Sequence, residues 1–184
     1  FDRANPVRTQ GETLTAREVV DEGARQISTE LDDEPIMKAR LLATIGKVYL
    51  SLGQYDDALR LIEQSRELRS EHMPAGDIAI AQSDELLGEV LTATGDRVAA
   101  REAYERAAAG FTALGPAGID GLTDAEGNLA WMLGQIGEFD AASAAIERAL
   151  ALARHRQPRL EKSLIGLLSN KATILANSGE PDSS

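Results

Sequence analysis

Glycine recurs at intervals of 42 residues along this chain of 184 residues, and no other feature of the sequence restricts its fold as strongly. The five glycines in this register are Gly11, Gly53, Gly95, Gly137 and Gly179. With 16 glycines in the whole chain, chance produces such a register on the order of a few times in ten thousand. Self-similarity at a fixed period is typical of proteins in which each repeat packs on its neighbours. The sequence therefore predicts a solenoid.

The residues around each repeated glycine predict two helices. After Gly53, a small residue, a large residue and a small residue follow at Ala58, Ile62 and Ser65, and the same pattern follows the other glycines up to Gly137. Offsets of four and seven residues lie on one face of a helix. Before the glycines, a second set of positions agrees in the same way, at Gly46, Gly88, Ala130 and Ala172. Each repeat is therefore predicted to be a helical hairpin, with the glycine in the left-handed conformation between its helices.

These patterns predict an all-α solenoid of antiparallel helix hairpins. The eight expected helices cover residues 14–31, 36–52, 55–71, 77–94, 97–114, 120–136, 139–156 and 159–177. The chain reads as one array, 1–184, in five parts: a preceding half-repeat at 1–34, repeats at 35–74, 75–116 and 117–158, and the first helix of a further repeat at 159–184. Because the first residue is Phe1 and not methionine, we expect the chain to be part of a longer protein.

The repeated residues resemble the tetratricopeptide repeat family. The clearest copy comprises Ile45-Gly46, Tyr49, Gly53-Gln54-Tyr55, Ala58, Ile62 and Ser65. The family norm is 34 residues, and the period of 42 is similar to the long repeats of kinesin light chains, as is Asn128-Leu129-Ala130. Residues 11–20 and 42–49 are also similar to the repeat region of bacterial serine/threonine kinases, although related arrays occur in bacterial winged-helix regulators. The resemblance implies a protein-interaction scaffold.

Composition excludes several other functions. The 30 acidic residues outnumber the 19 basic ones, and the net charge of -11 disfavours nucleic acid as a partner. No apolar run approaches the roughly 18 residues of a membrane span. The absence of cysteine removes disulfides and thiolate sites, and leaves cytoplasmic and extracytoplasmic locations open. Since no catalytic, metal-binding or cofactor-binding motif is found, and residues 115–121 are expected to form a loop with helix breakers, we do not expect an enzyme.

The resemblance also implies which residues face a partner, because in this family the inner face of the curve is formed by first helices. Transferred position by position, the inward set includes the candidate partner-binding residues Arg40, Lys47, Glu85, Glu89, Asn128, Trp131 and Asn170. Asp124 and Gly166 belong to the same inward set. The two asparagines have amides that can bond the main chain of an extended peptide, with helix capping or hydration as the alternative.

Trp131 is the only tryptophan of the chain, and it lies near two small residues, Gly127 and Gly134. These glycines are expected to leave a niche around the indole ring, which suits a binding anchor. Packing between adjacent first helices is an equally good use of the ring.

Two hypotheses for the function follow. In the first, the array is a non-catalytic module that binds a peptide or partner segment on its concave face. In the second, it is an architectural spacer or self-association segment, because Leu168, Ile174 and Leu175 are expected to leave an apolar end uncovered.

Overall fold

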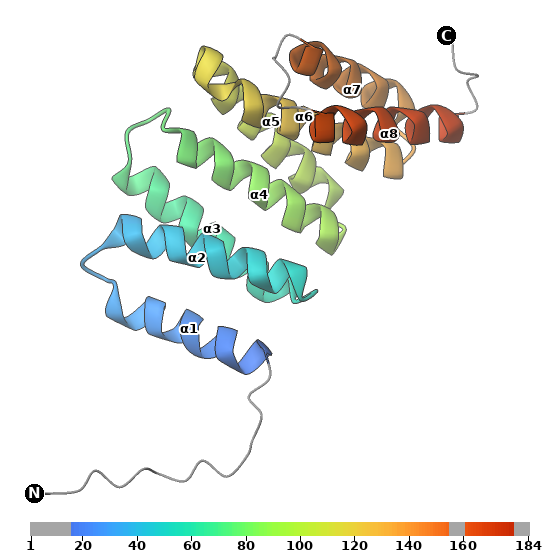
Figure 1. Ribbon diagram of the computed structural model, residues 1–184. Coiled ribbons are helices and arrows are strands. Elements are labelled where there is room, and N and C mark those ends of the chain that lie inside the picture. Colours follow the sequence, from blue (N-terminus) through green and yellow to red (C-terminus); the bar gives the residue numbers. More distant parts are fainter. Residues whose placement is uncertain (1–15, 155–160, 179–184) are drawn as a thin grey trace, which may run out of the picture.

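The computed structural model describes residues 16–154 and 161–178, and within them it contains eight α-helices and no strand (Figure 1). The helices are α1 (Ala16–Glu30), α2 (Pro35–Ser51), α3 (Tyr55–His72), α4 (Ile78–Thr94), α5 (Arg97–Ala113), α6 (Ile119–Gln135), α7 (Phe139–Arg154) and α8 (Glu161–Ser178). Every expected helix is present, with ends displaced by at most two residues. The predicted all-α hairpin solenoid is confirmed.

Each of the described hairpins turns at a repeated glycine. Gly53, Gly95 and Gly137 have φ values of 71°, 88° and 80°, the left-handed conformation that a residue with a Cβ rarely adopts. Gly95 ends α4, and the next residue, Asp96, begins α5 by accepting a hydrogen bond from the Ala99 amide at 3.1 Å. The predicted turns are therefore confirmed at these positions, while Gly11 and Gly179 lie outside the described residues.

The connection between α5 and α6 differs from the expected loop. Residues 115–118 form a short 3-10 helix, η1 (Gly115–Gly118), which leads directly into α6. Gly118 is buried there, and a Cβ at this position would lie 1.9 Å from the carbonyl oxygen of Phe111. The chain can make this tight turn because glycine lets its backbone approach that of α5.

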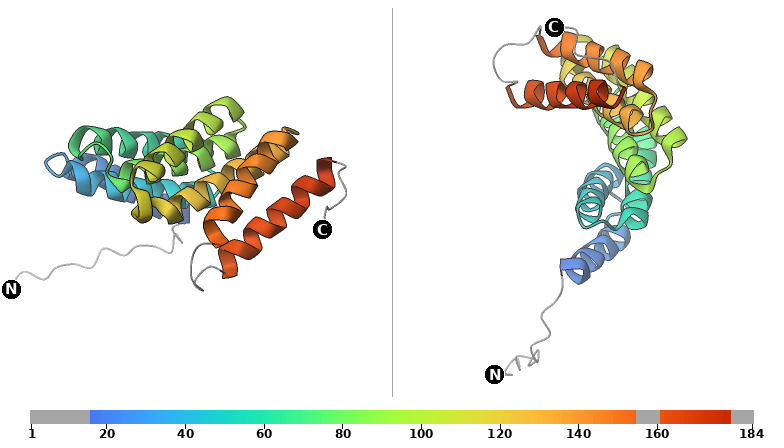
Figure 2. Two further views of the ribbon diagram at one scale, coloured as in Figure 1. Left: turned by 90° about the horizontal axis from the view of Figure 1, so that it is seen from above. Right: turned by 90° about the vertical axis from the view of Figure 1, so that its right-hand side faces the viewer.

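The hairpins stack into a curved array with its first helices on the inner side. The right-hand view of Figure 2 shows the stack as an arc, with α2 and α8 on the concave side. Among the described helices, α6 contacts both α4 and α8, whereas the second helices α3, α5 and α7 make no contact of comparable extent with one another. Elements on the inside of a curve approach one another most closely. No described helix is long and apolar enough to cross a membrane.

Candidate functional site

A groove opens on the inner side of the array, where α4, α6 and α8 meet. Its volume is about 310 Å³, and we call it the inner groove. The lining residues are Glu85, Glu89, Asp124, Gly127, Asn128, Gly166, Leu167 and Asn170. Four of the seven predicted partner-binding residues are among them, namely Glu85, Glu89, Asn128 and Asn170.

The 42-residue period explains why these side chains meet. Asn128 and Asn170 are one period apart, so they occupy equivalent positions on the neighbouring helices α6 and α8. Within one helix, residues four positions apart share a face, which brings Glu89 beside Glu85 and Asn128 beside Asp124. Successive first helices therefore place one row of polar side chains after another along the groove.

The inner groove holds acidic groups in an environment that disfavours their charge. Burial, followed by the charges of Asp124 and Glu89, raises the pKa of Glu85 to about 8. Reduced contact with water also raises the pKa of Glu89, as does the charge of Asp124. Burial raises the pKa of Asp124 itself. The charge of Lys47 opposes these shifts at Glu85 and at Glu89. Negative charge in the groove is therefore only partly compensated.

The other predicted residues lie outside the lining of the inner groove. Arg40 and Lys47 are exposed on α2. The charge of Lys47 still acts on the carboxylates of Glu85 and Glu89. The charge of Arg40 instead acts on Arg69 of α3, whose pKa is lowered by burial first and by Arg40 second. Of these two cations, Lys47 therefore affects the groove acids and Arg40 affects Arg69.

Trp131 lies on α6, three residues after Asn128, and remains 44% exposed. The neighbouring glycines do not leave a niche beside its ring. A Cβ at Gly127 would lie 2.7 Å from a methyl carbon of Leu167, and one at Gly134 would lie 3.0 Å from a side-chain carbon of Ile174. Both glycines therefore allow α8 to pack closely on α6, and Trp131 is left as an exposed aromatic side chain on the first helix.

The packing of α8 on α6 also covers part of the apolar surface that was expected to be exposed on the last helix. Ile174 is buried, with 3% of its surface exposed, because it packs against α6 at Gly134. Leu168 is 47% exposed and Leu175 is partly buried. The apolar surface expected at this end is thus smaller than predicted, and Leu168 is its most exposed described member.

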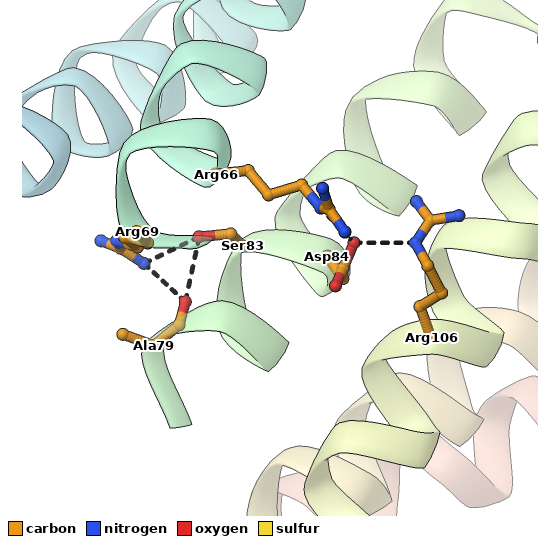
Figure 3. A network of polar contacts seen from close by, with 6 residues as sticks. All are labelled: Arg66, Arg69, Ala79, Ser83, Asp84 and Arg106. Atoms are coloured by element: carbon orange, nitrogen blue, oxygen red, sulfur yellow. Dashed lines mark hydrogen bonds and ion pairs between the residues drawn. The ribbon is translucent and has the colours of Figure 1, made fainter. Parts of the chain in front are cut away.

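A second set of ionic residues was not identified from the sequence. Asp84 of α4 is only 4% exposed, and its Oδ1 accepts hydrogen bonds from Arg66 Nε of α3 at 2.7 Å and from Arg106 Nε of α5 at 3.0 Å (Figure 3). One period later, Arg148 donates two hydrogen bonds of 2.7 Å to the buried carboxylate of Glu126. The spacing of 42 residues between Asp84 and Glu126, and between Arg106 and Arg148, was the available signal.

These ion pairs hold helices together. Two of their arginines also line a larger hollow. That hollow, of about 580 Å³, involves α3 and α5, and Arg66 and Arg106 contribute to its lining. Both arginines already donate to Asp84, so their charge is compensated. In Figure 3, Arg69 adds a further link, donating to the Ala79 carbonyl at 2.8 Å and to Ser83 Oγ at 2.9 Å. We regard this region as structural.

The described residues contain no cluster of three or more histidine or carboxylate side chains able to hold a metal ion. One of the histidines, His72, ends α3 and is exposed, and His155 lies outside the described residues.

Comparison with known proteins agrees with the repeat architecture. Residues 39–76 and 127–156 match family models described as tetratricopeptide repeat. No curated protein sequence matches the chain. The crystal structure of BtubC (BKLC) from P. vanneervenii is similar with a TM-score of 0.75 at 16% identity, and the matched region covers 90% of this chain and 66% of that one.

Two crystal structures of a putative kinesin light chain from Podosopora anserina, with nearly identical TPR-like repeats, are also similar. The TM-score is 0.69 for one of them and 0.67 for the other, each at 18% identity. In each of these two comparisons the matched region covers 88% of this chain, and it covers 76% and 77% of the two kinesin light chain structures. The chain thus spans about two thirds to three quarters of the length of these similar structures. At such identities the likeness establishes the fold alone, a solenoid of helix hairpins.

Proposed function

Because residues 39–76 and 127–156 are tetratricopeptide repeats, we propose that this chain is a non-catalytic scaffold that holds a peptide or partner segment on its concave face. Such repeats generally mediate protein–protein interactions and are typically not catalytic. The parent molecule in this proposal is a larger bacterial signalling protein, in keeping with the resemblance to kinase-associated arrays.

The observation that carries the proposal is the inner groove. Three successive first helices contribute its polar lining, so an extended segment that crosses α4, α6 and α8 meets equivalent positions in turn. Asn128 and Asn170 provide amides that both donate and accept hydrogen bonds, which suits the alternating groups of a peptide main chain. Trp131, on the same helix as Asn128, offers an exposed aromatic surface of the kind that often dominates binding energy.

The test is a selection of binding peptides from a random library, followed by measurement of their affinity for Trp131→Ala. We expect this variant to bind the selected peptides at least about tenfold more weakly, since truncating an aromatic anchor often costs about 2 kcal/mol or more of binding energy. The melting temperature should hardly change, because the ring is 44% exposed.

The matched control is Val98→Ala on α5, which also truncates an exposed apolar side chain, 72% exposed, but one that is not part of the groove lining. Equal affinity of wild type and Trp131→Ala for every selected peptide would count against the proposal. A loss of several kcal/mol of unfolding free energy in Trp131→Ala would assign the tryptophan to packing instead.

The alternative function is an architectural spacer that associates with itself and has no peptide ligand. Leu168 favours it, since a leucine that is 47% exposed on α8 offers an apolar contact. Light scattering over a range of protein concentrations distinguishes the two functions. A dimer that Leu168→Glu abolishes would support the spacer, and a monomer at all concentrations would contradict it.

A further inference from the structure

The carboxylates of the inner groove, with Glu85 partly buried and Glu89 and Asp124 exposed, lack the arginine partners that the buried acids Asp84 and Glu126 have. Asp84 is paired with two arginines and Glu126 with one, all within hydrogen-bonding distance. In contrast, Glu85, Glu89 and Asp124 make no ion pair with any lysine or arginine among the described residues. The difference separates acids that stabilise the stack from acids that have no cationic partner among the described residues.

Leaving these groups uncompensated has an electrostatic cost. Carboxylates that lie close together repel one another and resist ionisation, and the pKa of Glu85, the partly buried member of the set, is raised to about 8 by burial and by its acidic neighbours. The positive group that acts on Glu85 and Glu89 from within the protein is Lys47, which forms no ion pair with either. A cation supplied by a partner would relieve this repulsion.

The geometry indicates which kind of cation fits. Among the described side chains, no group of three or more carboxylates or histidines is placed to hold a metal ion. At about 310 Å³, the groove is at the lower end of the range for small-molecule sites. A long side chain with its charge at the end can reach between separated carboxylates.

We infer that the partner segment held in the inner groove carries a lysine or arginine, whose positive end lies between the carboxylates of Glu85, Glu89 and Asp124. This inference rests on the proposed function and adds the chemistry of the partner. The amides of Asn128 and Asn170 line the same groove and bind the main chain of the segment next to the basic residue.

The experiment uses the peptides selected from the random library on the full chain. Each selected peptide is compared with a version in which arginine is replaced by citrulline, or lysine by its uncharged acetylated form. Each is also measured against the triple variant Glu85→Gln, Glu89→Gln, Asp124→Asn. The matched control variant is Glu63→Gln, Glu67→Gln, Glu105→Gln, which also replaces three carboxylates by amides, at exposed positions on α3 and α5.

We expect the selected peptides to be rich in lysine or arginine. Neutralising the basic residue, or making the groove triple variant, should weaken binding by about tenfold or more, whereas the control variant should change it less than about twofold. The melting temperature of the groove variant should be no lower than that of the wild type, because its substitutions remove repulsion, and circular dichroism checks that it is folded.

Two results would overturn the inference and leave the proposed function standing. One is a set of peptides that Trp131→Ala weakens but that contain no basic residue. The other is basic peptides that bind the groove variant and the wild type equally, which would mean general attraction to a chain of net charge -11. If no selected peptide is affected by Trp131→Ala or by the groove variant, the proposed function and the inference both fail.

Discussion

At the scale of single residues, Glu85 is the side chain whose chemistry departs furthest from that of a surface carboxylate. It is partly buried on α4, and its pKa of about 8 lies far above the value of about 4.3 for glutamate in an unfolded chain. Between these two values the folded protein holds the proton and the unfolded chain releases it. The neutral form of Glu85 therefore favours folding, and this stabilisation is lost as the pH rises through that interval.

The corresponding prediction concerns Glu85→Gln, which cannot ionise. At about pH 5 the variant and the wild type should have similar melting temperatures. By about pH 8.5 the free energy of unfolding of the variant should be higher by about 1 to 2 kcal/mol, a modest gain because solvent screens the charges around a partly exposed side chain. Thermal unfolding followed by circular dichroism across this pH range measures the difference. The same substitution at Glu63, which is exposed on α3, tests whether the gain belongs to the groove. A difference that stays constant over this pH range would contradict the prediction.

At the scale of helices, each hairpin depends on the close approach of its first helix to its second. The contact between α4 and α5 is made at Gly88, where a Cβ would lie 2.7 Å from two ring carbons of Tyr104. Tyr104 is itself only 3% exposed, so its ring cannot move into solvent without leaving the core. In the preceding hairpin, Gly46 faces Ile62 in the same way, with a Cβ that would lie 2.6 Å from a side-chain carbon.

We predict that Gly88→Val lowers the free energy of unfolding by about 1 to 3 kcal/mol, because the new side chain overpacks the α4–α5 contact. Chemical denaturation with urea measures this loss. The comparison variant is Gly166→Ala on α8, where an added Cβ meets no atom within 4 Å. There, the better helix propensity of alanine should raise stability by about 0.5 kcal/mol or more. An unchanged unfolding midpoint for Gly88→Val would mean that the two helices can separate at little cost.

At the scale of the whole molecule, each hairpin is supported by its neighbours, and the ends have fewer of them. Helix α1 packs on α2 and buries one of its described side chains, Ala24. Helix α4 packs on α3, α5 and α6, and α6 packs on α4, α5, α7 and α8. Stability in a repeat protein is close to the sum of each repeat's own stability and that of its contacts, so the middle should be held most firmly.

Hydrogen exchange should therefore be graded along the stack. We predict that backbone amides in α1 exchange at least about tenfold faster than those in α4 and α6 under native conditions, because α1 opens without disrupting the centre. Mass spectrometry of peptide fragments resolves the helices. Uniform protection from α1 to α6 would show instead that the array unfolds as one cooperative unit.

What the sequence determined by itself was the local architecture. The helices, their order and the left-handed glycine turns follow from spacings within about 20 residues, repeated at a constant period, and such spacings act before any distant contact forms. The period also placed Glu85, Glu89, Asn128 and Asn170 on one inner surface. These features could be read without the structure because each is a property of one helix or one turn.

The tertiary structure decided which of these residues lie together. It excluded Arg40 and Trp131 from the groove lining, filled the space beside Gly127 with Leu167, and buried Asp84 between arginines of two different hairpins. These outcomes depend on the rotation and distance between successive hairpins, to which many weak contacts contribute. A regular period in the sequence does not specify that geometry, because the side chains at equivalent positions differ from one repeat to the next.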